Sequence, residues 1–168
     1  MENMEYQSVE EQLDERVIEI ARVSKTVKGG RRLRYRVTVV VGDNNGMIGM
    51  GSGKANAVPD AMRKASETAR KNMKKVNLYK TTIPHEAYGR CGGAVVMMRP
   101  ASEGTGVISG GPVRAVVEAV GIRDIRTKAL RSNNPCNVVR ATIAGLASLR
   151  DAEQVDAIRG KTVKEILG

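Results

Sequence analysis

The chain has 168 residues, 41% of them hydrophobic, which is enough for a folded core in one domain or two small ones. It contains no Trp or Phe and only four Tyr, so we expect an aliphatic core. A formal charge of +10 favours nucleic acid as the partner, and no apolar run approaches the roughly 18 residues that a membrane span needs.

The positive charge is concentrated in one part of the chain. Residues 1–15 carry six acids and no base, residues 16–80 carry 16 bases and 4 acids, and residues 81–168 carry 12 bases and 8 acids. We expect residues 1–12 to be a flexible acidic tail. Because this N-terminus is acidic and polar, it is not typical of a signal peptide, and a cytoplasmic protein with free thiols is expected.

The first predicted feature is a basic hairpin. Residues 16–27 are rich in β-branched side chains and are predicted to form a strand, residues 28–31 (Lys-Gly-Gly-Arg) a turn, and residues 32–42 a second strand. Alternate residues of a strand lie on opposite faces, so the arginines of the second strand are expected on one face and a buried set on the other. This buried set is Leu33, Tyr35, Val37, Val39 and Val41.

A third strand and a helix are predicted next. A turn at residues 42–46 leads into a glycine-rich strand that ends near Lys54, and Pro59 is expected to open a helix. At about 100° per residue, one face of this helix is apolar: Val58, Ala61, Met62, Ala65, Ala69, Met73 and Val76. The opposite face is basic, with no acid among its members: Arg63, Lys64, Arg70, Lys71, Lys74 and Lys75.

A second unit of short strands and helices follows a connector at residues 77–92. A strand is predicted at Ala94–Arg99, and glycine pairs at 104/106 and 110/111 bracket another at 107–108. Pro112 opens a helix, and Asn134-Pro135 caps one that runs to about Leu149. Residues 123–131 are either a strand or a helix, and two short helices are expected to close the chain. The side chains predicted to point inward are Val113, Val116, Val117, Val120, Val138, Val139, Ile143 and Leu146.

Sites for catalysis, metals or cofactors are not indicated. The run Gly51-Ser52-Gly53-Lys54 lacks the first glycine and the final hydroxyl of a phosphate-binding loop, because Ile48 and Ala55 occupy those positions. We expect instead a glycine-rich strand against which a helix packs closely. His85, the single histidine, has no metal-ligand spacing around it, and Cys91 and Cys136 form no CxxC pair.

The basic residues therefore predict a nucleic-acid interface, although lysines and arginines often only solvate a helix face. Because aromatic residues are scarce, we expect contacts with the backbone and shape of structured RNA rather than a base-stacking platform. The residues predicted to bind RNA are Lys25, Lys28, Gly29, Gly30, Arg31, Arg32, Arg34, Lys54, Arg63, Lys64, Arg70, Lys71 and Lys74.

Several of these segments resemble a known family. Residues 29–65 resemble the signature segment of bacterial ribosomal protein S5, and residues 22–31 are similar to its RNA-binding loop. Residues 99–122 and 134–146 resemble its second domain, and residues 159–168 its C-terminus. The resemblance covers residues 13–168 in order. Departures at Ala57 and at the pair Arg34 and Arg36 are expected to be surface changes.

The resemblance implies an α+β fold: a double-stranded-RNA-binding-like domain at residues 13–76, then an α/β two-layer domain with a helical tail at residues 77–168. It also implies a structural constituent of the small ribosomal subunit, near the mRNA entry where head meets body. The implied partners are ribosomal RNA and ribosomal proteins S4 and S8, with S12 as a further contributor to translational accuracy. The hairpin tip would influence spectinomycin susceptibility, and Gly104, Gly106 and Arg114 would form a protein interface.

Two other classes of function remain open at this point. One is a separate regulator that binds double-stranded RNA, which would not sediment with small subunits. The other is a small enzyme that uses the glycine-rich loops, which would bind a free nucleotide. We expect neither an enzyme nor a cofactor.

Overall fold

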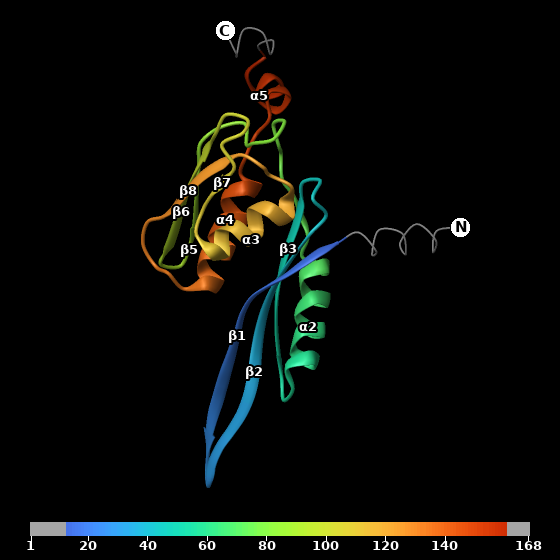
Figure 1. Ribbon diagram of the computed structural model, residues 1–168, viewed down its shortest axis with the longest axis vertical. Coiled ribbons are helices and arrows are strands. Elements are labelled where there is room, and N and C mark those ends of the chain that lie inside the picture. Colours follow the sequence, from blue (N-terminus) through green and yellow to red (C-terminus); the bar gives the residue numbers. More distant parts are fainter. Residues whose placement is uncertain (1–12, 161–168) are drawn as a thin grey trace, which may run out of the picture.

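Two four-stranded sheets with helices packed on them make up residues 13–160, the part of the chain that the computed structural model describes (Figure 1). The first sheet has the antiparallel order β1-β2-β3-β4, and the second has the order β5-β6-β8-β7 with only β7 and β8 parallel. The α+β class predicted from the sequence is confirmed.

The first sheet carries one helix. Its elements are β1 (Asp14–Val27), β2 (Gly30–Gly42), β3 (Met47–Ala55), α2 (Val58–Lys71) and β4 (Lys74–Lys75). The elements of the second part are β5 (Ala87–Cys91), β6 (Ala94–Pro100), β7 (Val107–Ile108), α3 (Gly111–Val120), β8 (Ile125–Ala129), α4 (Pro135–Ala147) and α5 (Ala152–Arg159).

Helix α2 packs directly onto the backbone of β3. Alternate residues of this strand are glycines, and a Cβ at Gly49, Gly51 or Gly53 would lie 2.1, 1.9 or 2.1 Å from a carbonyl oxygen of α2. The helix presents alanines to them, since Ala61, Ala65 and Ala69 are fully buried. The prediction that this glycine run lets a helix pack closely is confirmed. The glycines of β3 serve to bring α2 close to the strand backbone.

The opposite face of the first sheet is covered by the second part of the chain. Figure 1 shows α3 and α4 between the two sheets. Thr38 and Val40 are 0% exposed although they lie on the face assigned to the arginines, whereas Leu33, which was assigned to the buried face, is 47% exposed. The predicted alternation is therefore wrong at both ends of β2. The body of the molecule buries both faces of the strand near Gly42, and neither face near the hairpin tip.

Backbone contacts fasten the two sheets together. The turn after β2 docks on the end of α3, where the Asn44 and Gly46 amides donate to the carbonyls of Ala119 (3.1 Å) and Val120 (3.0 Å). Gly42 packs against the same turn of α3, since a Cβ there would lie 2.0 Å from the Ala119 oxygen. An ion pair between Arg16 of β1 and Glu118 of α3 spans the same boundary.

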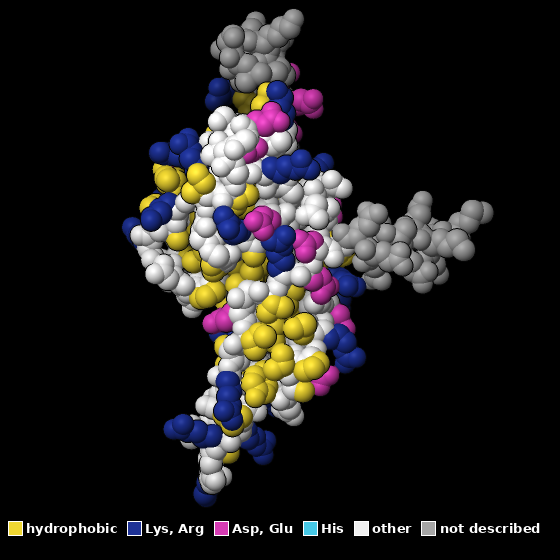
Figure 2. Space-filling view, in the orientation of Figure 1, with side chains coloured by type: hydrophobic (Ala, Val, Ile, Leu, Met, Phe, Trp, Pro, Cys, Tyr) yellow, Lys and Arg dark blue, Asp and Glu magenta, His cyan; other side chains and the backbone are white. Residues whose placement is uncertain are grey.

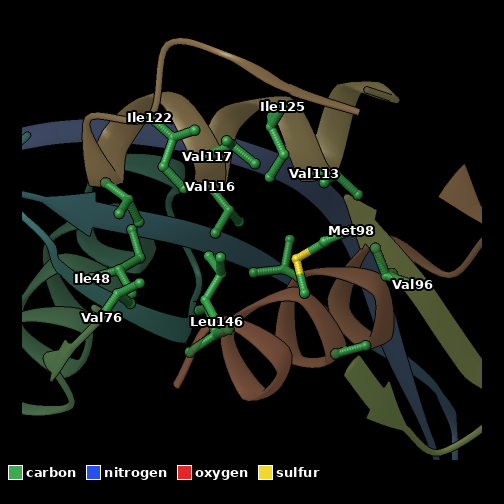
Figure 3. Packing of buried hydrophobic residues seen from close by; sticks show 14 of the residues in the cluster. Ile48, Val76, Val96, Met98, Val113, Val116, Val117, Ile122, Ile125 and Leu146 are labelled. Carbon is green, nitrogen blue, oxygen red and sulfur yellow. The ribbon is translucent and has the colours of Figure 1, made fainter. Parts of the chain in front are cut away.

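One aliphatic core runs across this boundary. Figure 3 shows Ile48 of β3 and Val76, which follows β4, in the same cluster as residues of α3 and α4. All inward positions predicted for the two later helices are buried. The predicted cap of α4 is also confirmed, because the Asn134 side chain accepts hydrogen bonds from the amides of Cys136 and Asn137.

Several predicted boundaries were wrong. Helix α2 ends at Lys71, so Met73, Lys74, Lys75 and Val76 lie beyond it, with the two lysines in β4. The predicted connector at 77–92 contains strand β5, and the undecided segment 123–131 contains strand β8. A single helix, α5, is described near the C-terminus. The expected acidic tail and a second closing helix lie outside the described residues.

The glycine row of β3 generates the first prediction. Replacing Gly51 with Ala places a methyl group 1.9 Å from the Ala65 oxygen and 2.5 Å from the Ala69 nitrogen, so α2 must shift. We expect the free energy of unfolding in urea to fall by about 1–3 kcal/mol or more. Gly93→Ala is the matched control, because its Cβ meets only a side-chain carbon at 3.7 Å. Equal stability of the two variants would contradict this packing.

Candidate nucleic-acid interface

The β1–β2 hairpin extends beyond the body of the molecule (Figure 1). The two strands stay paired to the turn, with Arg22 opposite Tyr35 and Val27 opposite Gly30. At about 3.3 Å per residue, the segment from Arg22 to Val27 is roughly 17 Å long. Figure 2 shows Lys and Arg side chains gathered at this end of the molecule.

The turn at the tip depends on two glycines. Gly29 has φ 98° and Gly30 has φ 153°, a region that residues with a Cβ rarely adopt. An added Cβ would meet nothing within 4 Å at either position, so the constraint is backbone conformation rather than space. Lys28 and Arg31 flank these glycines and are exposed. The predicted tight turn with basic residues on both sides is confirmed.

The strand register brings several bases of the hairpin onto one face. Lys25 lies opposite Arg32, Arg34 opposite Val23, and Arg36 opposite Lys54 of β3. Cross-strand partners share a face, so these bases continue the face that α3 and α4 cover nearer the body. Lys25, Arg32, Arg34 and Lys54 line one groove that has neither an acidic nor an aromatic lining residue.

Arg36 marks the inner end of this basic face. Its Nη2 lies 3.4 Å from Glu19 Oε2, and both side chains are about one-third exposed. Arg36, expected to be a surface change, is partly exposed and pairs with an acid beside the covered part of the sheet. The uncompensated charge of the hairpin begins at Arg34.

The basic face predicted for α2 is divided in two. Arg63 and Arg70 lie on the side of β1, together with Glu67, and Arg70 Nη2 is 3.0 Å from Glu15 Oε1. The prediction of a face without acids is thus wrong on this side. Lys64 and Lys71, separated from them by about 100° around the helix, lie on the other side. Lys74 follows in β4, not in the helix as predicted.

The loop before α3 is held by a buried carboxylate. Asp124 is 4% exposed, and its Oδ1 accepts a hydrogen bond from the Gly106 amide at 2.9 Å. Gly104 and Gly106 have φ of 88° and 78°, which lets the backbone curl around this oxygen. The Gly106 amide and then the Thr81 hydroxyl lower the pKa of Asp124. Nothing in the sequence singled out Asp124, because a lone acid beside a short strand is normally exposed.

Arg114 fastens the other end of the same loop. Its Nη2 donates to the Val107 carbonyl at 2.8 Å, and its Nε lies 3.7 Å from Glu118 Oε1. Glu118 also pairs with Arg16 of β1, so it joins the helix to the first sheet. Gly104, Gly106 and Arg114 are therefore brought together around strand β7.

Comparison with family models decides which family has this arrangement. The model "Ribosomal protein S5, N-terminal domain" matches residues 13–77, and "Ribosomal protein S5, C-terminal domain" matches residues 89–159. The chain belongs to the ribosomal protein S5 family. The resemblance stated from the sequence is thereby confirmed. An S5-family protein is a structural, RNA-binding protein of the small ribosomal subunit, which agrees with the basic hairpin.

The remaining reactive side chains of this S5-family protein have structural contacts. His85 Nε2 accepts a hydrogen bond from the Arg150 amide (3.2 Å), and its Nδ1 lies 2.9 Å from the Glu86 carbonyl oxygen. Cys136 Sγ lies 3.3 Å from Thr38 Oγ1. Within residues 13–160, no three His, Cys, Asp or Glu side chains are placed to hold a metal ion, and no helix has the length and apolarity to cross a membrane.

The buried carboxylate generates a pH prediction. A lowered pKa means that ionised Asp124 stabilises the fold above its ordinary pKa of 3.8 and that this stability is lost as pH falls through the lowered value. Asp124→Asn should therefore lower the melting temperature at pH 7, and the gap to the unsubstituted protein should narrow below pH 3.8. Glu103→Gln, an exposed change in the same loop, is the control. A gap that is constant down to pH 2 would contradict the role of the charge.

Proposed function

We propose that this S5-family protein binds small-subunit ribosomal RNA chiefly through the uncovered face and the tip of the β1–β2 hairpin. The observation that supports this most is the single groove shared by Lys25, Arg32, Arg34 and Lys54, in which no acid neutralises the charge. Because no aromatic side chain lines the groove, the contacts are with phosphates rather than stacked bases. Lys28, Gly29, Gly30 and Arg31 extend the interface to the turn.

The bases of α2 contribute unequally to this interface. Lys64 and Lys71 are exposed and, with Lys74, lie on the side of α2 away from β1. Arg63 and Arg70 lie beside Glu15 and Glu67, so their net attraction for a phosphate is smaller. We therefore rank the hairpin first, the lysine side of α2 second, and the arginine side last.

The place of the protein in the subunit is the finer part of the proposal. The resemblance supports a position near the mRNA entry of cytoplasmic ribosomes, where it stabilises the head relative to the body beside S4 and S8. With S4 and S12 it would support translational accuracy. The loop from Gly104 to Arg114 is the proposed protein interface, because Asp124 and the Arg114 guanidinium hold its backbone in one shape.

The hairpin assignment is tested with Lys28→Gln and Arg31→Gln. Each change should weaken binding to a small-subunit rRNA transcript by roughly 1–3 kcal/mol where the phosphate contact is direct, and should reduce the salt dependence of binding. Both residues lie outside the core, so the melting temperature should stay unchanged. Arg90→Gln, an exposed change on the second sheet, is the control.

The same variants are then followed in cells. The native protein should sediment with small subunits, the tip variants should incorporate less well, and spectinomycin susceptibility should change. Unfolding of the tip variants without any effect on RNA binding or drug response would show that the tip is structural.

The loop assignment is tested with Arg114→Gln. Losing the bond to the Val107 carbonyl frees one end of the loop, so we expect weaker association with S4 and a changed miscoding frequency in a reporter assay. The melting temperature should fall only slightly, because Arg114 is exposed. Unchanged accuracy together with intact S4 association would remove this loop from the interface.

A further inference from the structure

A second groove lies between the two halves of the molecule, at the open edge of β3. Strand β2 pairs with one edge of β3, and on the other edge β4 pairs only with Met47 and Ile48, so that second edge has no described strand beside it from Gly49 onward. Helices α2 and α4 flank this edge on opposite sides (Figure 1). The resulting groove has a volume of about 700 Å³, which is within the range of small-molecule sites.

The walls of this groove are positively charged. Lys71 of α2, Lys74 of β4 and Arg140 of α4 line it, and all three are exposed. No acidic residue lines the groove, and no described acid lies within ion-pair distance of these three side chains. Lys71 also stabilises the negative end of the α2 helix dipole, because it lies in the last turn of that helix. The dipole of α2 does not explain Lys74 or Arg140, which lie outside this helix. The charges therefore favour an anion as the occupant.

The floor of the groove is apolar. Met50 and Met73 are half-buried, and Ile143 of α4 is 8% exposed at the edge of the core. Flexible thioether side chains adapt to flat ring systems and make favourable contacts with them. A phosphate alone would use the walls and leave this floor uncovered, whereas a nucleotide uses both.

The groove and the proposed hairpin interface are neighbours along β3. Ser52 lines the groove and Lys54 lines the hairpin face, and the two residues are one strand repeat apart on the same side of β3. An RNA strand on the hairpin face is thereby led to Arg140. Because the groove is open along this edge, a polymer can pass through it.

We propose that this groove binds one unpaired nucleotide of the RNA held by the hairpin, with Lys71, Lys74 and Arg140 on the phosphates and the methionine floor under the base. The inference rests on the proposed RNA-binding function. It adds Arg140, which sequence reasoning missed because α4 is otherwise a core helix. It also adds a preference for RNA with a bulged or looped nucleotide over a continuous duplex.

The test measures the affinity of the full chain for two RNA probes, a duplex and the same duplex with one bulged nucleotide. The native protein should bind the bulged probe about tenfold more tightly, as expected for one added charged contact and one base contact. Arg140→Gln should remove this preference and reduce the salt slope by about 0.7, the value for one phosphate of a single strand. Met73→Ala should reduce the preference but leave the salt slope unchanged.

Controls separate the possible failures. Arg90→Gln, which also removes one exposed arginine, should keep the preference, and Lys28→Gln should weaken both probes equally. If Arg140→Gln behaves like Arg90→Gln while Lys28→Gln weakens binding, the hairpin assignment stands and the groove assignment is overturned. If the native protein binds neither probe, the proposed function itself fails.

Two competitors test the class of occupant. Uridine monophosphate or an oligoglutamate peptide is added to the complex with the bulged probe. Neither should displace the RNA at millimolar concentration. If the mononucleotide displaces the RNA from the native protein but not from the Arg140→Gln variant, the proposal is overturned in favour of a free-nucleotide site. Displacement by the peptide would overturn it in favour of an acidic protein segment.

Discussion

The first sheet is covered on both faces along the half of β2 that ends at Gly42, and the rest of the structure depends on this burial. One cover is α2, which approaches so closely that β3 must carry glycines. The other is the pair α3 and α4, which buries Thr38 and Val40. The covered half is thus fixed from both sides, and the uncovered half of the hairpin projects from it and is anchored only where the two halves join.

This division of the hairpin explains where the charge lies. A strand that loses its apolar cover keeps its pairing but exposes both faces, and charged side chains are stable there. Arg36, at the boundary, still has Glu19 as a partner, whereas Arg34 and Arg32 lie past the last acid of β1. The uncovered half of the hairpin can therefore bind a polyanion without first breaking ion pairs.

Local patterns predicted the elements well, and long-range contacts were the part that sequence reasoning missed. The helix starts at Pro59 and Pro112 and the Asn134-Pro135 cap each depend on a few neighbouring residues, and each was confirmed, whereas the alternation of β2 was wrong at both ends of the strand. Burial of Thr38 depends on a helix about 100 residues away. The pairing of Arg70 with Glu15 spans 55 residues, so a single helical face could not reveal it. Strand β5 was missed because Gly89, which a helix needs for close packing, resembles a loop signal.

A density map of the small ribosomal subunit that contains this chain, at side-chain resolution, tests the central claim most directly. The account predicts ribosomal RNA phosphates against Lys25, Arg32, Arg34 and Lys54, with the hairpin tip in contact with RNA and α2 still packed on β3. A map in which that face of the hairpin lies in solvent or against protein, while RNA lies elsewhere on the chain, would contradict it.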